Sequence, residues 1–157
     1  LIGGGGFASR LMEEVREKRG LAYSVYSFIQ PFRHTSVLSG GVATRADAIG
    51  QSLDVIRKEL TEIAENGPSA EEWQNAKDYL TGSYALRFDS NSKIATQLLG
   101  LMEDDFGPDY IDNRNAMIEA LTLEDAKRVA KRLIKTDDLI VTIVGQPNPQ
   151  AEEKKGG

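Results

Sequence analysis

The sequence predicts an α+β fold, a two-layer sandwich in which helices cover one face of a mainly antiparallel sheet. Two segments near the start, residues 21–32 and 36–43, carry the β-branched and aromatic side chains that are typical of strands. A third such segment, residues 139–144, lies near the end, and the long stretch between them has helical patterns. Three strands are few for a stable sheet.

The first 30 residues contain a glycine loop, a helix and a strand in close succession. Gly3–Gly6 predict a flexible loop, because glycine loses more backbone entropy on ordering than any other residue. A helix should follow to about residue 19, since apolar side chains recur at helical spacing, namely Phe7, Leu11, Met12 and Val15. Gly20 suits the position just after a helix that ends in a basic turn. We therefore expect Arg16, on the helix flank, to lie close to Tyr23 at the start of the strand.

The strand after Gly20 should pair with residues 36–43 as an antiparallel hairpin, because only a short polar turn separates them. Alternation along the first strand divides its side chains between two faces, Tyr23, Val25 and Ser27 on one and Ser24, Tyr26 and Phe28 on the other. Gly40–Gly41 in the second strand predict a bulge or a close approach of two backbones.

Five further helices are predicted between residues 44 and 133. Four begin at a residue suited to cap the first turn, namely Thr44, Ser69, Ser92 and Thr122, and Ser69 with Glu72 has capping-box spacing. The other runs through Ile111, Arg114 and Met117. The helix after Thr44 is expected to bury Ile49, Leu53, Ile56, Leu60 and Ile63, and the helix after Ser69 is expected to bury Trp73, Ala76, Tyr79 or Leu80, and Tyr84. The helix after Ser92 is expected to bury Ile94, Leu98, Leu101 and Met102, and the helix after Thr122 is expected to bury Leu123, Ala126, Val129, Ala130 and Leu133.

The end of the chain combines an apolar segment with a polar tail. Residues 139–144 are all apolar or threonine, which is typical of a central strand covered on at least one face. Beyond Gln146, two prolines and a charged, glycine-ended sequence predict disorder. With no internal repeat and no linker, we expect one domain over residues 1–146 and a disordered tail over 147–157.

Composition excludes several classes of function. A net charge of -5 and a pI ≈ 5.0 argue against a nucleic-acid partner, whose phosphates require a clustered basic surface. No apolar run approaches the roughly 20 residues of a membrane span. The absence of cysteine excludes disulfides, cysteine catalysis and thiolate metal ligands. No secretory signal is present, and because the chain begins Leu-Ile without Met, we expect a fragment or a processed piece of a longer parent.

The run GGGGFASRLMEEVREKRGLAYSVYS resembles the C-terminal-half signature of the pitrilysin/insulinase-type zinc peptidases, the inverzincin family that includes mitochondrial processing peptidase. RFDSNSKIATQLLG and LIVTIVGQP also resemble later parts of that domain. The resemblance implies a LuxS/processing-peptidase-like metallopeptidase half-domain, truncated at its N-terminus, whose further strands precede this chain. It also implies that Arg16 and Tyr23 lie in the half that does not bind zinc, and reach across a central chamber to the substrate.

A zinc site is not expected in this chain. An inverzincin needs His-x-x-Glu-His on one helix, whereas the single histidine here, His34, is in a polar turn and is expected to be an ordinary exposed residue. Neighbouring carboxylates such as Glu13 and Glu14 point in different directions on a helix and do not chelate together. We therefore expect no metal ligand and no cofactor in this domain. The resemblance implies a zinc supplied by the upstream half or by a partner subunit.

Arg16 and Tyr23 have two interpretations. As ordinary surface residues, Arg16 would pair with Glu13 or Glu17, and Tyr23 would pack its ring and expose its hydroxyl. In the role that the resemblance implies, Tyr23 is catalytic, because its phenol O–H stabilises the negative charge that develops on a peptide carbonyl oxygen. Arg16 and Tyr23 would then both bind substrate, with the guanidinium holding a backbone carbonyl. We favour this second interpretation.

The resemblance thus implies a C-terminal peptidase domain that closes a proteolytic chamber, binds an extended peptide or unfolded-protein substrate, and is inactive alone. Its partner would be the N-terminal zinc-binding domain of the same chain or a sister subunit. The alternative is a structural core-type subunit of the same fold, which acts in protein assembly without proteolysis. Resemblance to bacterial paired subunits slightly favours the divided peptidase and a periplasmic location, with the cytoplasm as the other location.

Overall fold

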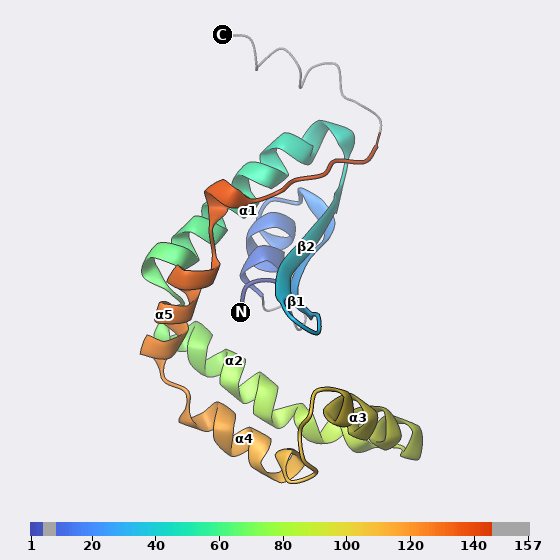
Figure 1. The fold of residues 1–157 in the computed structure, drawn as a ribbon. Coiled ribbons are helices and arrows are strands. Elements are labelled where there is room, and N and C mark those ends of the chain that lie inside the picture. Colours follow the sequence, from blue (N-terminus) through green and yellow to red (C-terminus); the bar gives the residue numbers. More distant parts are fainter. Residues whose placement is uncertain (5–8, 146–157) are drawn as a thin grey trace. The chain divides into compact units, whose positions relative to one another are not determined.

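We describe the fold from a computed structural model of residues 1–4 and 9–145 (Figure 1). The chain divides into two compact units, one formed by residues 1–67 with those from 129 onward, the other by residues 68–128. No helix of the described residues has both the length and the apolar content that a membrane span requires. The predictions for Gly5, Gly6, Phe7 and the tail 147–157 concern residues outside this description.

The first unit is built on the predicted antiparallel hairpin, which is confirmed. Strand β1 (Ala22–Pro31) pairs with β2 (Ser36–Thr44) along their whole length, with one irregularity between Ala22 and Ser24. The glycines of β2 allow a close approach rather than a bulge. A Cβ atom added to Gly41 would lie 2.8 Å from the Tyr26 hydroxyl oxygen, and one on Gly40 would lie 2.7 Å from the Tyr26 carbonyl oxygen.

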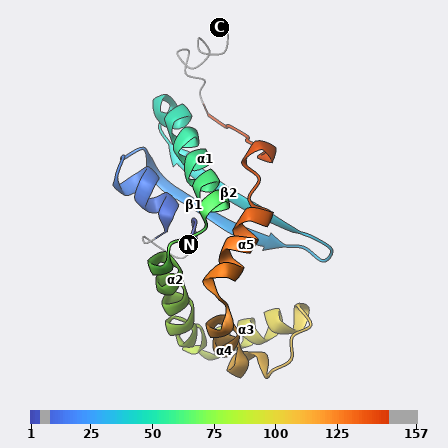
Figure 2. The same ribbon diagram turned by 90° about the vertical axis from the view of Figure 1, so that its left-hand side faces the viewer.

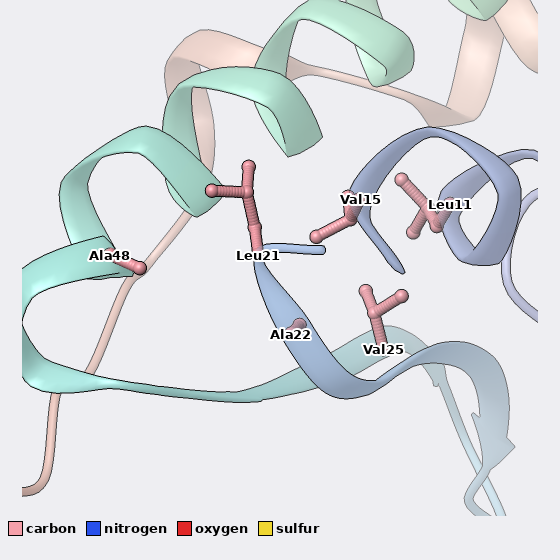
Figure 3. Packing of buried hydrophobic residues seen from close by; sticks show 6 residues of the cluster. All are labelled: Leu11, Val15, Leu21, Ala22, Val25 and Ala48. Carbon is pink, nitrogen blue, oxygen red and sulfur yellow. The ribbon is translucent and has the colours of Figure 1, made fainter. Parts of the chain in front are cut away.

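Helices cover one face of this hairpin, which confirms the predicted two-layer α+β arrangement (Figures 1 and 2). The first helix begins at Arg10 and has π geometry over Met12–Glu17 (η1). A short 3-10 turn, Ala46–Ala48 (η2), leads into α1 (Ile49–Asn66). The buried side chains that these elements bring together are labelled in Figure 3: Leu11, Val15, Leu21, Ala22, Val25 and Ala48.

The predicted apolar stripe of α1 is confirmed at its C-terminal end, where a second cluster forms. Leu60 and Ile63 pack with Ile134, which follows α5 (Leu123–Leu133). The Thr61 hydroxyl donates to the Thr136 hydroxyl oxygen at 3.1 Å, at the start of the 3-10 turn Thr136–Asp138 (η4). Gly67 ends α1 with a φ of 73°, a conformation that glycine adopts without strain.

The second unit contains α2 (Ala70–Gly82), the 3-10 turn Tyr84–Phe88 (η3), α3 (Asn91–Glu103), α4 (Tyr110–Ala120) and the first part of α5 (Figure 2). The capping box of Ser69 and Glu72 is confirmed, with both reciprocal hydrogen bonds present. Thr122 and Asp125 likewise bond reciprocally at the start of α5. Lys77 is buried, and its Nζ donates to the carbonyl oxygen of Glu119 at the end of α4 at 2.7 Å.

The predicted buried faces in this unit are partly wrong. Tyr84 is buried, but Tyr79 and Leu80 are 53% and 39% exposed, and no described residue of α3 is buried. Met102, expected on the inner face of α3, is 72% exposed. The helical spacing of apolar residues sets which face of a helix can be buried, but burial also requires a neighbouring element that covers that face.

Two predicted helix caps are also wrong. Thr44 is the last residue of β2, and its hydroxyl donates to the carbonyl oxygen of Leu21 instead of capping the next helix. Ser90, not Ser92, caps α3, because Ser90 has the extended backbone of a cap residue and accepts a hydrogen bond from the Lys93 N–H. Asp89 pairs with Lys93 at 2.7 Å.

The predicted strand over residues 139–144 is wrong in the described chain. These residues form no ladder, and Ile140 and Val144 are 95% and 93% exposed. A strand exists only where a neighbouring strand supplies hydrogen-bond partners, and in the described residues the sheet contains β1 and β2 alone. The β propensity of the segment is therefore not sufficient.

Candidate functional site

Arg16 and Tyr23 lie on either side of a sharp turn from helix to strand, as predicted. Arg16 is in the last turn of η1, Gly20 has a φ of 58°, and β1 begins at Ala22. The Arg16 guanidinium carbon lies 5.9 Å from the centre of the Tyr23 ring, a cation–π distance. The predicted proximity is confirmed, while the catalytic and substrate-binding roles stay predictions.

The helix that carries Arg16 has π geometry, which the sequence pattern did not predict. The Lys18 N–H donates to the Glu13 carbonyl oxygen at 2.9 Å, five residues back instead of four. A π-helical turn contains one residue more than an α-helical turn, so it is wider and rotates the side chains that follow it. Such turns are rare in proteins and frequent at functional sites. The apolar positions Leu11 and Val15 fit an ordinary α-helix equally well, so their spacing carries no signal for the wider turn.

Tyr23 projects from a β-bulge at the start of β1. Ala22 pairs with Thr44 and Ser24 pairs with Ala43, so two steps along β1 match one step along β2, and Tyr23 is the extra residue. The bulge breaks the alternation of side chains. Tyr23 is 84% exposed whereas Val25 is 3% exposed, so the prediction that Tyr23 and Val25 share a face is wrong. Bulges re-aim side chains in this way beside active sites.

The turn between the two residues is held by hydrogen bonds to Glu14, a residue that the sequence analysis did not assign to the site. The Glu14 carboxylate accepts from Lys18 Nζ at 2.6 Å and from Arg19 Nη1 at 2.5 Å. These bonds, first that from Lys18 and then that from Arg19, lower the pKa of Glu14 below its ordinary value, and the same pairing raises the pKa of Lys18. The i,i+4 spacing of Glu14 and Lys18 was the available sequence signal.

Main-chain bonds close the same turn, and an ion pair accompanies it. The Gly20 N–H donates to the Arg16 carbonyl oxygen at 2.8 Å, and the Leu21 N–H donates to the Val15 carbonyl oxygen at 3.0 Å. Arg16 Nε lies 3.7 Å from the Glu17 carboxylate, so the ordinary surface pairing is present in a loose form. Both interpretations of Arg16 are therefore compatible with this geometry.

The residues that the structure describes do not fit a zinc site. In the described part of the chain, no three His, Asp or Glu side chains gather where they could hold a metal ion. His34 is exposed in the turn between β1 and β2, as predicted. A zinc ion in a peptidase needs three protein ligands, and a lone exposed histidine does not supply them.

The described fold is an α+β arrangement in which helices cover one face of an antiparallel hairpin. The chain belongs to the family described as the peptidase M16 inactive domain, whose match covers residues 1–80. A crystal structure of the peptidase M16 inactive domain from Pseudomonas fluorescens has 34% sequence identity and a TM-score of 0.76, and the match covers 86% of this chain and 32% of that chain. The predicted family and fold are thereby confirmed.

Curated relatives are longer than this chain. An uncharacterized zinc protease of Streptomyces coelicolor is 34% identical over 132 residues, which are 83% of this chain and 28% of that protein. A non-peptidase homolog of Helicobacter pylori is 38% identical over 95 residues, which are 60% of this chain and 21% of that protein. The chain thus spans less than a third of the length of either relative.

Proposed function

We propose that this domain is the non-zinc half of a zinc-dependent peptidase, where it closes the proteolytic chamber and binds extended peptide through Arg16 and Tyr23. One observation carries the proposal: a guanidinium lies 5.9 Å from the ring of a tyrosine that is 84% exposed. A π-helix and a β-bulge present these two side chains. Relatives named as zinc proteases support the peptidase class.

The two side chains are close enough to contact one substrate chain. The Arg16 guanidinium carbon lies 5.9 Å from the centre of the Tyr23 ring, and the Tyr23 hydroxyl is at the edge of that ring. In an extended peptide, carbonyl groups two residues apart point the same way at a separation of about 6.6 Å. The guanidinium and the hydroxyl would therefore meet different carbonyl groups of the same peptide.

The two residues would contribute different chemistry. The planar guanidinium of Arg16 has several N–H donors in a fixed arrangement, which suits the holding of a carbonyl oxygen in the ground state. Tyr23 would donate its phenol O–H to the scissile carbonyl oxygen, and this hydrogen bond strengthens as negative charge develops there. The metal chemistry belongs to the other half, which is either upstream in the same chain or in a sister subunit. This domain alone would not hydrolyse peptides.

A second candidate function is protein assembly without proteolysis. One relative of this chain, from Helicobacter pylori, is named a non-peptidase homolog, and that name excludes peptidase activity for that protein. Exposed apolar side chains in the second unit would suit an assembly surface, among them Leu99, Met102 and Met117, which are 58%, 72% and 55% exposed.

Native mass spectrometry of the full-length parent, isolated from its host, tests the proposal. We expect one zinc per active assembly, with peptide hydrolysis that the assembly retains through purification. A zinc shared with a second, similar-sized chain would identify a divided peptidase, and one zinc per copy would identify a self-sufficient one. An assembly without zinc and without hydrolysis would overturn the peptidase proposal and support the assembly function.

A further inference from the structure

We infer that Thr44 is a positioning residue for Tyr23, because its hydroxyl holds the backbone of the bulge from which Tyr23 projects. Thr44 is the residue that the sequence suggested as a helix cap, and its hydroxyl is used elsewhere. The structural part of the inference concerns this chain alone. Its kinetic part rests on the proposed function.

A hydroxyl pair ties the start of β1 to β2 and α1. Thr44 Oγ1 donates to the carbonyl oxygen of Leu21 at 2.5 Å, and Leu21 is only 9% exposed. The Ser52 hydroxyl shares its one proton between Thr44 Oγ1 at 3.3 Å and the Ala48 carbonyl oxygen at 2.9 Å. Because Ser52 is 0% exposed and fixed within α1, it holds the Thr44 side chain in the orientation that reaches Leu21.

The bond to Leu21 selects the bulged register over the regular one. In the regular register, strict alternation would place Tyr23 on the same face as Val25, which lies against the helices. In the observed register Ala22 takes that inward position opposite Thr44, and Tyr23 is the extra residue. The hydroxyl of Thr44 reaches the carbonyl that immediately precedes Ala22. This hydrogen bond therefore keeps Ala22 in the inward position opposite Thr44, and the Tyr23 side chain stays on the outward face.

Two substitutions of Thr44 separate the hydroxyl from the volume of the side chain. Thr44→Val keeps the β-branched shape and removes the donor, whereas Thr44→Ser keeps the donor. Thr61→Val is the matched control, since Thr61 makes a hydroxyl–hydroxyl bond to Thr136 in the same unit and does not touch the hairpin bulge. NMR of this chain reports the Tyr23 ring resonances, the Ser24 amide shift and the nuclear Overhauser contact between Arg16 and Tyr23.

In Thr44→Val we expect the Tyr23 and Ser24 resonances to move and the contact between Arg16 and Tyr23 to be lost. Thr44→Ser should restore both, and Thr61→Val should leave both unchanged. Unchanged resonances in Thr44→Val would overturn the inference. If Thr44→Val does not fold, Ser52→Ala takes its place, because it removes the brace and leaves the bond to Leu21. It should then move the same resonances by a smaller amount, and no movement would overturn the inference.

The kinetic test uses the intact parent assembly. We expect Thr44→Val to lower kcat roughly threefold to tenfold, the scale of one intramolecular hydrogen bond, with KM changed less than about twofold. In a Tyr23→Phe background the same substitution should change kcat by less than about twofold, because Thr44 acts through the Tyr23 hydroxyl. An equal loss in both backgrounds would overturn the inference. Normal turnover of Tyr23→Phe would instead overturn the proposed function, and the NMR comparison would still decide the role of Thr44.

Discussion

Arg19 donates from one nitrogen to both the carboxylate and the main-chain carbonyl oxygen of Glu14, at 2.5 Å and 2.6 Å. The contact spans the end of the helix that carries Arg16, directly before the glycine turn. Because it joins a side chain to the backbone of an earlier turn, it limits how far this helix end can open. The Arg16 side of the site therefore depends on Glu14, as the Tyr23 side depends on Thr44.

The Glu14 bonds should make the stability of the helix end depend on pH. The pKa of Glu14 in the folded chain is lowered from its ordinary value of 4.5, so its stabilising effect is present above that value. The effect is lost as the pH falls through the folded-state pKa. We expect the difference in unfolding free energy between the native chain and Glu14→Gln to be largest near pH 7 and to vanish in acid. Urea denaturation at several pH values measures it, and a difference that does not decrease as the pH falls below 4.5 would contradict the assignment.

Tyr23→Phe should lower kcat of the active assembly by about 10²–10³, the cost of one lost donor to a developing negative charge. The fold should not change, because Tyr23 is 84% exposed. Steady-state kinetics and circular dichroism measure the two quantities. Tyr26→Phe is the control, since Tyr26 lies on the same strand and is 51% exposed, and it should keep normal turnover.

Arg16→Ala should raise KM roughly tenfold to a hundredfold, the scale of a hydrogen bond to a charged group, with a smaller change in kcat. Arg16→Lys should recover only part of the affinity, because lysine keeps the charge and lacks the planar set of donors. Arg57→Ala, at an exposed position of α1, is the control. A lower melting temperature with unchanged KM would show that Arg16 contributes to stability and not to substrate binding.

Val15→Ala should lower the unfolding free energy by about 2 kcal/mol, because Val15 is 0% exposed at the centre of the cluster between helix and hairpin. Val144→Ala removes the same atoms from a side chain that is 93% exposed, and it should change stability by less than about 0.5 kcal/mol. Thermal and urea denaturation of the two variants give the comparison. Equal effects would mean that the cluster in Figure 3 does not form the core in solution.

The segment 139–144 should promote self-association of this chain. It contains six consecutive uncharged residues, five of them β-branched, without proline or glycine, and Ile140 is 95% exposed. Ile140→Lys should therefore reduce light scattering and thioflavin binding on prolonged incubation. Leu86→Lys, which places the same charge at a 69% exposed position in η3, should not. Equal behaviour of the two variants would refute a role for this segment.

Much of this protein could be predicted from local sequence signals. The long α1, the capping box at Ser69 and the glycine turn at Gly20 follow from interactions within a few residues, so the pattern of those residues is sufficient. The pairing of the hairpin follows from the short polar turn that joins its two strands. The pairing of Arg16 with Tyr23 across the glycine turn is local for the same reason. The family resemblance rests on the same stretch and is confirmed.

Other features depended on what lies beside a segment, which a linear pattern does not contain. Residues 139–144 have the composition of a strand, but a strand also needs a partner, and the described chain supplies none. The apolar stripe of α3 likewise needs a covering element. At the site, the periodicity near Tyr23 fits two registers, and the choice between them belongs to Thr44, a residue on the opposite strand. Only the tertiary structure brings the Thr44 hydroxyl to the Leu21 carbonyl oxygen, and this contact decides that Tyr23 lies on the outward face.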